Sequence, residues 1–257
     1  MKLKALALAA GLIVSNYALG ATASTSAENF CSDRKAVRYT KDLVANRKNQ
    51  ISFTNRGGLV NGGVCWWHSR LTRKFAYLAI YRPDLPKPTN AEAAKIIKKI
   101  RLGNVTEVPG FSNLYDFSRE FRAEIQDRLE KWQIGDGFMR QQWTVGLWGS
   151  SSTSAEKLKE RMDDLYEYVE KEGKLAYQML QIRGITSHAW LVLNVEKTSD
   201  GYIMEVLDSN YTSTSKIRYR YGQERINSYG GLVNITGKKA ELRRLEKAVK
   251  KYCKKLN

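Results

Sequence analysis

One stretch of the sequence decides the fold: SHAWLVLNVEKTSDGYIMEVLD, residues 187–208. It contains two apolar, β-branched runs, His188–Glu196 and Tyr202–Leu207, which are typical of strands. The segment between them ends in Asp-Gly, a pair that readily adopts the positive φ values of a hairpin turn. The two strands are therefore predicted to pair antiparallel. This pairing brings His188, at the start of the first strand, close to Asp208, at the end of the second.

Around this hairpin, helical patterns dominate the earlier part of the chain. Apolar residues recur at helical spacing in six segments, roughly Ser32–Arg47, Trp66–Tyr81, Ala91–Leu102, Leu114–Lys131, Ser154–Glu172 and Lys238–Lys255. Two further strands are predicted at Lys174–Ile182 and Lys216–Tyr221. Connectors are predicted at Arg82–Asn90, which is rich in proline, and at Gly135–Thr153. Helices first and strands second favour an α+β fold over alternating βαβ units.

The N-terminus has the pattern of a secretory signal peptide. Lys2 and Lys4 precede a short apolar run, Ala5–Val14, which is followed by small residues. The run is about half as long as the roughly 20 residues of a membrane-spanning helix. We therefore expect cleavage after Ala23 or, alternatively, after Gly20.

The mature protein is predicted to be a single domain of residues 24–257, preceded by a leader of residues 1–23. We expect it to be exported, to the periplasm or beyond the cell, without a transmembrane segment. Loss of Lys2 and Lys4 lowers the formal charge of +17 by two, to +15. Such a charge attracts anionic partners, for example an acidic or envelope-associated protein or peptide substrate. Solubility alone also explains it, because acidic residues are interspersed with the basic ones. Nucleic acid is not expected, since only the charge favours it.

The chain has three cysteines, an odd number for an exported protein. Cys31 lies near the mature N-terminus and Cys253 near the C-terminus. The simplest pairing joins these two residues as a terminal disulfide in an oxidising compartment. That pairing leaves Cys65 as the free thiol.

Cys65 lies in the segment NGGVCWWHS, residues 61–69, where a glycine-rich turn leads into a predicted helix. At a helix start, unpaired N–H groups and the positive end of the dipole stabilise a thiolate, which is the nucleophilic form of cysteine. The backbone N–H of Cys65 is also a candidate donor to an oxyanion. A buried structural cysteine is the alternative interpretation.

A thiolate enzyme needs an imidazole to hold and donate a proton, and His188 is the candidate. Asp208, or in its place Asn210, would orient the ring. The other histidine of the chain, His68, lies three residues after Cys65, on the same helix face. We expect His68 to pack beneath the site, although tuning the thiolate or binding substrate are alternatives.

These three pieces, the Gly-Gly-Val-Cys-Trp-Trp helix start, the His-Ala-Trp strand and the Val-Leu-Asp-Ser-Asn strand end, resemble papain-like cysteine enzymes and the related transglutaminase-like proteins. The resemblance covers about a fifth of the chain. It implies a papain-like fold and a Cys65, His188 and Asp208 triad that attacks an amide or ester carbonyl through an acyl-enzyme, with no cofactor. The long interval between Cys65 and His188 is more similar to papain-type peptidases. The His-Ala-Trp strand followed by an aspartate is more similar to transglutaminase-like members.

The sequence departs from the papain pattern at the oxyanion donor. Papain-type enzymes carry a glutamine six residues before the nucleophile, and this chain has Leu59 there. Asn61 or Asn55 are the possible substitutes. The loss of one oxyanion donor costs roughly 10²–10³ in rate. A non-catalytic, basic, envelope-binding protein with the same fold is therefore the alternative function. A metal site is not expected, because the C-x-x-C and H-x-x-x-H spacings are absent.

Overall fold

The computed structural model describes residues 21–55, 64–139, 153–182, 187–229, 231–236 and 239–256. Residues 1–20, which hold most of the predicted leader, lie outside this range. Thr22 and Ser24, just after residue 20, are hydrogen-bonded to the rest of the fold. Tyr39 Oη donates to the carbonyl oxygen of Thr22 at 2.6 Å, and the Tyr81 N–H donates to that of Ser24 at 2.9 Å.

The described part is an α+β protein whose helices mostly precede its strands. The helices are α1 (Ala27–Asp33), α2 (Tyr39–Ala45), α3 (Cys65–Leu78), α4 (Asn90–Leu102), α5 (Leu114–Glu120), α6 (Arg122–Met139), α7 (Ala155–Tyr166) and α8 (Lys239–Cys253). A 3₁₀ turn, η1 (Arg47–Asn49), follows α2, and a π-helical turn, η3 (Glu167–Lys171), follows α7. The strands are β1 (Ala79–Arg82), β2 (Thr106–Pro109), β3 (Ala176–Ile182), β4 (Ser187–Thr198), β5 (Gly201–Asp208), β6 (Ser215–Arg220) and β7 (Leu232–Thr236).

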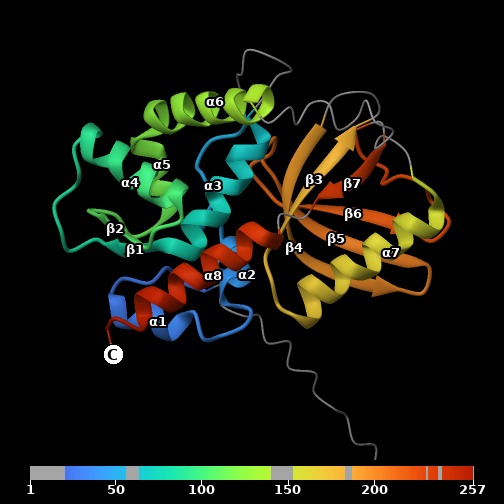
Figure 1. The fold of residues 1–257 in the computed structure, drawn as a ribbon, viewed down its shortest axis with the longest axis horizontal. Coiled ribbons are helices and arrows are strands. Elements are labelled where there is room, and N and C mark those ends of the chain that lie inside the picture. The colour runs from blue at the N-terminus through green and yellow to red at the C-terminus, as the bar shows by residue number, and fades with distance from the viewer. Residues whose placement is uncertain are drawn as a thin grey trace, which may run out of the picture.

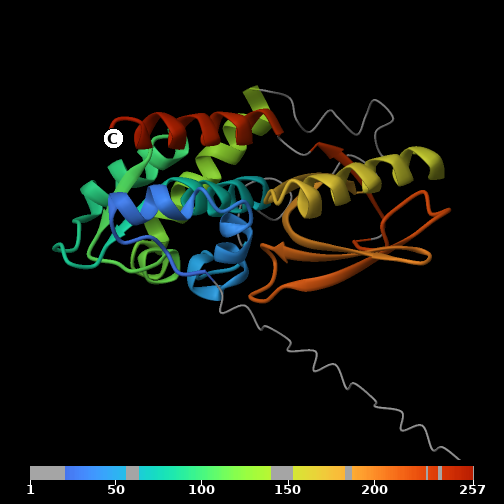
Figure 2. The same ribbon diagram turned by 90° about the horizontal axis from the view of Figure 1, so that it is seen from below.

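Five strands form one sheet in the order β6-β5-β4-β3-β7, and every neighbouring pair is antiparallel. This sheet lies on one side of the molecule, and α1 to α6 lie on the other (Figure 1). Helix α7 covers one face of the sheet, as the turned view shows (Figure 2). The short strands β1 and β2 pair in parallel within the helical half.

Helix α3 is the centre of the fold, because it contacts the sheet through β3 and β4 and the helices α2, α4, α6 and α8 (Figure 1). All of its residues are buried, including Arg70, Arg73 and Lys74. The sequence predicts an amphipathic helix here. The structure differs because α8 and α6 bring the carboxylates of Glu241 and Asp136 to the polar side of α3. Because these carboxylates pair with the basic residues of α3, the charged face of the helix can also be buried, under α6 and α8.

The predicted hairpin is present, with Trp190 opposite Asp208 and Thr198 opposite Gly201. The reason for glycine at position 201 differs from the expected one. A Cβ atom at Gly201 would lie 2.0 Å from the carbonyl oxygen of Tyr219 on β6, so the close approach of a third strand requires glycine. The two loop residues, Ser199 and Asp200, do not have positive φ angles.

Several predicted boundaries differ from the structure. The segment Ser32–Arg47 is split between α1 and α2, and α6 continues to Met139, inside the predicted connector Gly135–Thr153. The helix expected to reach Tyr81 ends at Leu78, because the chain enters β1 and pairs with β2. Strands β1, β2 and β7 are absent from the sequence prediction. Each has only four or five residues, too few to show a clear alternation.

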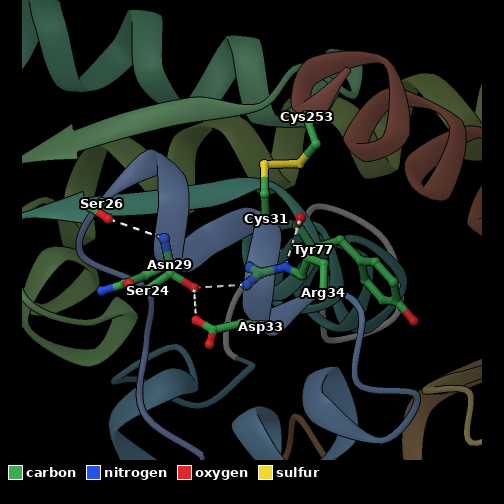
Figure 3. Close-up of a disulfide and its surroundings, with 8 residues drawn as sticks. All are labelled: Ser24, Ser26, Asn29, Cys31, Asp33, Arg34, Tyr77 and Cys253. Atoms are coloured by element: carbon green, nitrogen blue, oxygen red, sulfur yellow. Dashed lines mark hydrogen bonds between the residues drawn. A yellow bond between two sulfur atoms is a disulfide. The ribbon is translucent and has the colours of Figure 1, made fainter. Parts of the chain in front are cut away.

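The predicted disulfide is present and joins Cys31 of α1 to Cys253 of α8, with 5.7 Å between the Cα atoms. Figure 3 shows it beside a small polar network around Arg34, whose guanidinium donates to Ser24 Oγ and to the Tyr77 carbonyl oxygen. Ser24 Oγ in turn donates to Asp33 at 2.6 Å. The disulfide thus joins the first and last described helices, and the hydrogen bonds attach the N-terminal segment to the end of α3.

Within the described ranges, no helix combines the length and the apolar character that crossing a bilayer requires.

Candidate functional site

Cys65 is the first residue of α3 and the free cysteine of the chain. Its side chain is buried, with 6% of the residue exposed. The first N–H groups of a helix have no acceptor within the helix, so they and the helix dipole favour negative charge at this end. The side chain of Cys65 therefore lies at the positive end of α3.

The side of α3 that carries Cys65 faces the start of β4. Ser69 follows Cys65 by one helical turn on the same face. Its Oγ donates to the carbonyl oxygen of Ala189 at 3.2 Å. Since Ala189 is next to His188, this bond fixes the first turns of α3 beside the histidine.

His188 and Asp208 form a buried pair across the hairpin. Nε2 of His188 donates to Oδ1 of Asp208 at 2.9 Å, and only 4% and 2% of the two residues are exposed. The carboxylate only accepts, so the proton of this bond belongs to the imidazole. With Nε2 engaged in this way, Nδ1 is the nitrogen that remains for Cys65.

The electrostatics of the pair favour its charged form. Burial lowers the pKa of His188, but hydrogen bonds and charge interactions with Asp208 and Cys65 outweigh burial and raise this pKa to about 10. For Asp208, burial acts in the opposite direction and raises the pKa. The hydrogen bonds from His188, the Asn210 N–H and Tyr229 outweigh burial, so the pKa of Asp208 is lowered overall. The structure thus brings Cys65, His188 and Asp208 into one interacting group.

Tyr229 supports this group from the side of Asp208. Its hydroxyl donates to Asp208 Oδ2 at 2.7 Å, and its ring lies 4.8 Å from the imidazole of His188 between centroids. Tyr229 has a φ of +47°, which is uncommon for a residue other than glycine. Such backbone conformations cost free energy and often occur at functional sites.

Asn210 is an accessory residue that holds Asp208 and Tyr229. Its backbone N–H donates to Asp208 Oδ1 at 2.9 Å, and its side-chain amide donates to Tyr229 Oη at 3.0 Å. The sequence offers Asn210 as a substitute for Asp208. The structure instead places Asp208 against the histidine and Asn210 behind the carboxylate.

Asn55 connects this network to the nucleophile helix. Its Nδ2 donates to Asn210 Oδ1 at 2.9 Å, and its Oδ1 accepts a short hydrogen bond from the N–H of Val64, the residue before Cys65. A continuous set of polar contacts therefore runs from His188 through Asp208, Asn210 and Asn55 to the start of α3. Asn55 thus positions the start of α3 relative to Asn210.

A buried ionic cluster holds α3 from its other side. Arg70 pairs with Asp136 of α6 at 2.7 Å and with Glu241 of α8 at 2.9 Å, and Arg73 and Lys74 also pair with Glu241. Trp67 donates its indole N–H to Asp136 and lies under the Arg70 guanidinium. Burial raises the pKa of Glu241, but its three cations outweigh burial and lower it. Removal of one partner from such a cluster strongly destabilises a fold.

His68 lies outside the His188 network. It is buried, and its Nε2 is 2.9 Å from the carbonyl oxygen of Phe53. Burial lowers the pKa of His68 to about 4, although the Phe53 carbonyl opposes the shift. His68 is therefore a neutral packing residue at physiological pH.

The structure describes some of the residues that could donate to an oxyanion, but not all of them. The candidate donor Asn61 lies outside the described residues, as does Leu59, which occupies the position of the papain-type glutamine. The N–H of Cys65 remains a candidate donor at the first position of α3. Gln133 of α6 reaches the same helix end, because its Oε1 accepts from the Trp67 N–H at 3.4 Å.

Sequence reasoning missed Tyr229 and Gln133 altogether. Gln133 has no local signal, since the packing of α6 on α3 brings it to this helix end. Tyr229 precedes two glycines, Gly230 and Gly231, a pattern that indicates a turn but not a partner for Asp208.

In the part of the chain that the structure describes, His, Cys, Asp and Glu nowhere gather in groups of three that could hold a metal ion. Comparisons with protein-family models, with curated proteins and with solved structures gave no match.

Proposed function

We propose that the protein is an exported, papain-like cysteine hydrolase or acyl transferase that cleaves or exchanges peptide or isopeptide bonds. Cys65 is the nucleophile, His188 the acid and base, and Asp208 the residue that orients the imidazole. One observation carries the proposal: the imidazole of His188 donates to the carboxylate of Asp208, and interactions with this carboxylate and with the Cys65 thiol at a helix start raise its pKa to about 10. An imidazolium beside a thiol stabilises the thiolate.

The reaction follows from these positions. The thiolate of Cys65 attacks the carbonyl carbon, and an S–C bond forms. The C–N bond to the leaving group breaks as His188 donates its proton to the departing amine, which leaves a thioester. Water, or an acceptor amine in the transferase, then attacks the thioester. His188 takes the proton of this second nucleophile, the C–S bond breaks, and the thiolate is restored.

The architecture also supports the papain-like assignment. The nucleophile begins a central helix that packs on an antiparallel sheet, and the histidine and aspartate lie on adjacent strands of that sheet. The oxyanion is stabilised by the Cys65 N–H, whose place at the helix start leaves it without an acceptor in the helix.

Alkylation by iodoacetamide tests the nucleophile directly, because Cys65 is the one cysteine outside the disulfide. We expect modification at pH 6 to 7 to be faster than that of free cysteine, of which about 3% is thiolate at pH 7. Mass spectrometry should find the adduct on Cys65, and Cys65→Ala should take up none. Cys65 is only 6% exposed, so the experiment also measures whether a small electrophile reaches the sulfur.

A second assay separates catalysis from mere reactivity. With p-nitrophenyl acetate, the protein should release a burst of p-nitrophenolate and carry one acetyl group on Cys65, which water then removes. Cys65→Ser is the matched control, since it keeps the size of the side chain. Alkylation no faster than that of free cysteine, together with no acetyl-enzyme, would favour the non-catalytic envelope-binding protein.

A further inference from the structure

A cleft of about 430 Å³ opens beside the candidate triad. Asp208 and Tyr229 line it together with residues of β6, a strand at one edge of the sheet. The Tyr229 ring that borders the cleft is the same ring that lies against His188. A molecule in this cleft can therefore contact the tyrosine that packs against the imidazole.

The cleft presents cations to such a molecule. Lys216, Arg218 and Arg220 line it, and all three are exposed. They alternate along β6, which places their side chains on one side of the strand. Asp200 pairs with both arginines, at 2.7 Å to Arg218 and 3.2 Å to Arg220, so one carboxylate is shared by two guanidinium groups.

The only acidic residue that lines the described cleft is already occupied. Asp208 accepts hydrogen bonds from His188, from the Asn210 N–H and from Tyr229, and it is buried. The other walls supply the phenol of Tyr211, which is 54% exposed, and hydroxyl and amide groups such as that of Asn227. Donors and positive charge thus dominate the surface that a ligand would contact.

We infer that this cleft binds a carboxylate-rich segment of the substrate, so that the bond attacked by Cys65 lies beside a run of aspartate or glutamate residues. The inference rests on the proposed function for the meaning of "substrate", but the binding itself does not require catalysis. An acidic peptide matches both the charge of the cleft and the amide chemistry of the neighbouring site.

Binding is measured with the Cys65→Ala protein and a fluorescent peptide rich in glutamate, by fluorescence anisotropy at low salt. The variant Lys216→Gln/Arg218→Gln/Arg220→Gln removes three charges from the cleft. The matched control, Arg244→Gln/Lys250→Gln/Lys254→Gln, removes three exposed charges from α8 and the turn that follows it. We expect the cleft variant to raise the Kd about tenfold and the control less than about twofold.

A milder variant guards against misfolding of β6. Lys216→Gln alone should raise the Kd about two- to threefold, and Arg218→Lys/Arg220→Lys, which retains the charge, should bind nearly as well as the parent. Equal weakening by the cleft and α8 variants would overturn the inference. So would equally tight binding of a neutral peptide, or of an oligonucleotide of the same length that responds to the same variants.

The two proposals fail separately. Alkylation of Cys65 in the three-charge cleft variant should proceed at the parent rate, because none of the three residues touches the thiol network. Normal alkylation with unchanged peptide binding would refute the inference about the basic cleft and leave the nucleophile in place. Slow alkylation of the parent protein with strong, cleft-dependent binding would remove the enzyme and leave a binding protein.

Discussion

The two histidines have nearly the same burial and opposite protonation. His68 is 6% exposed and His188 is 4% exposed, yet the pKa of the first is lowered to about 4 and that of the second is raised to about 10. Burial lowers both values. The difference arises from their partners, since His68 meets a neutral carbonyl and His188 meets a carboxylate and a thiol. Burial alone therefore does not identify the functional imidazole, whereas its charged neighbours do.

The two residues also link folding to pH with opposite signs. The raised pKa of His188 adds stability that is fully present below its unfolded value of 6.5 and is lost as the pH rises through about 10. The lowered pKa of His68 adds stability that is present above 6.5 and is lost as the pH falls through about 4.

The largest expected effect comes from removing Asp208, the carboxylate that separates the pKa of His188 from that of His68. Asp208→Asn takes away the carboxylate, so the pKa of His188 should fall by roughly 1 to 3 units, while that of His68 should fall much less, because the charge of Asp208 is the last of the causes that act on it. NMR titration of the imidazole C–H signals measures both, because the chain contains only two histidines. In the parent protein, neither signal should titrate between pH 6 and 8. Titration of either one in that range would contradict the assignment.

The next effect concerns acid stability. Because His68 must stay neutral in the fold, acidification from pH 6.5 to about 4 should cost about 3 kcal/mol of unfolding free energy through this residue alone. His68→Gln should therefore lose less stability over that pH range, whatever its stability at pH 7. Urea denaturation at pH 7 and pH 4.5 measures the two losses. Equal losses in the parent and the variant would show that His68 does not control acid unfolding.

The third prediction uses the thiol as a reporter. His188→Gln removes the imidazolium, so Cys65 should behave as an ordinary thiol and its alkylation at pH 7 should slow about 30-fold. His68→Gln is the matched control and should alkylate within about twofold of the parent rate. A similar loss in both variants would mean that the effect is one of packing rather than of charge.

The smallest effect sharpens the description of the His188 side. Tyr229→Phe removes the hydroxyl that donates to Asp208, so the pKa of Asp208 should rise by about one unit. Protonation of Asp208 at acid pH changes the chemical shift of the His188 C–H signal, so the acid limb of this titration curve measures the pKa of Asp208. Tyr166→Phe, a change in a tyrosine that packs on Tyr202, should leave that limb unchanged. An unchanged pKa of Asp208 in Tyr229→Phe would show that the Tyr229 hydroxyl does not stabilise this carboxylate.

The sequence allowed the pairing of His188 with Asp208 to be predicted, because a hairpin register follows from local pattern and turn chemistry. The same is true of the Cys31–Cys253 disulfide, which follows from the positions of three cysteines. The role of Tyr229 was not predictable, since it depends on where a long connection returns to the sheet. Nor was the burial of α3, whose charged face is covered only because Glu241, far along the chain, lies on it.

The disulfide has a consequence for damage to the chain. It joins residues 222 positions apart, so nearly the whole described fold lies inside one covalent ring. A single cut by a protease at any loop between Cys31 and Cys253 opens that ring but does not separate the pieces. The nicked protein would stay one molecule, with its last helix still attached beside the first, and a second cut would be needed to release a fragment.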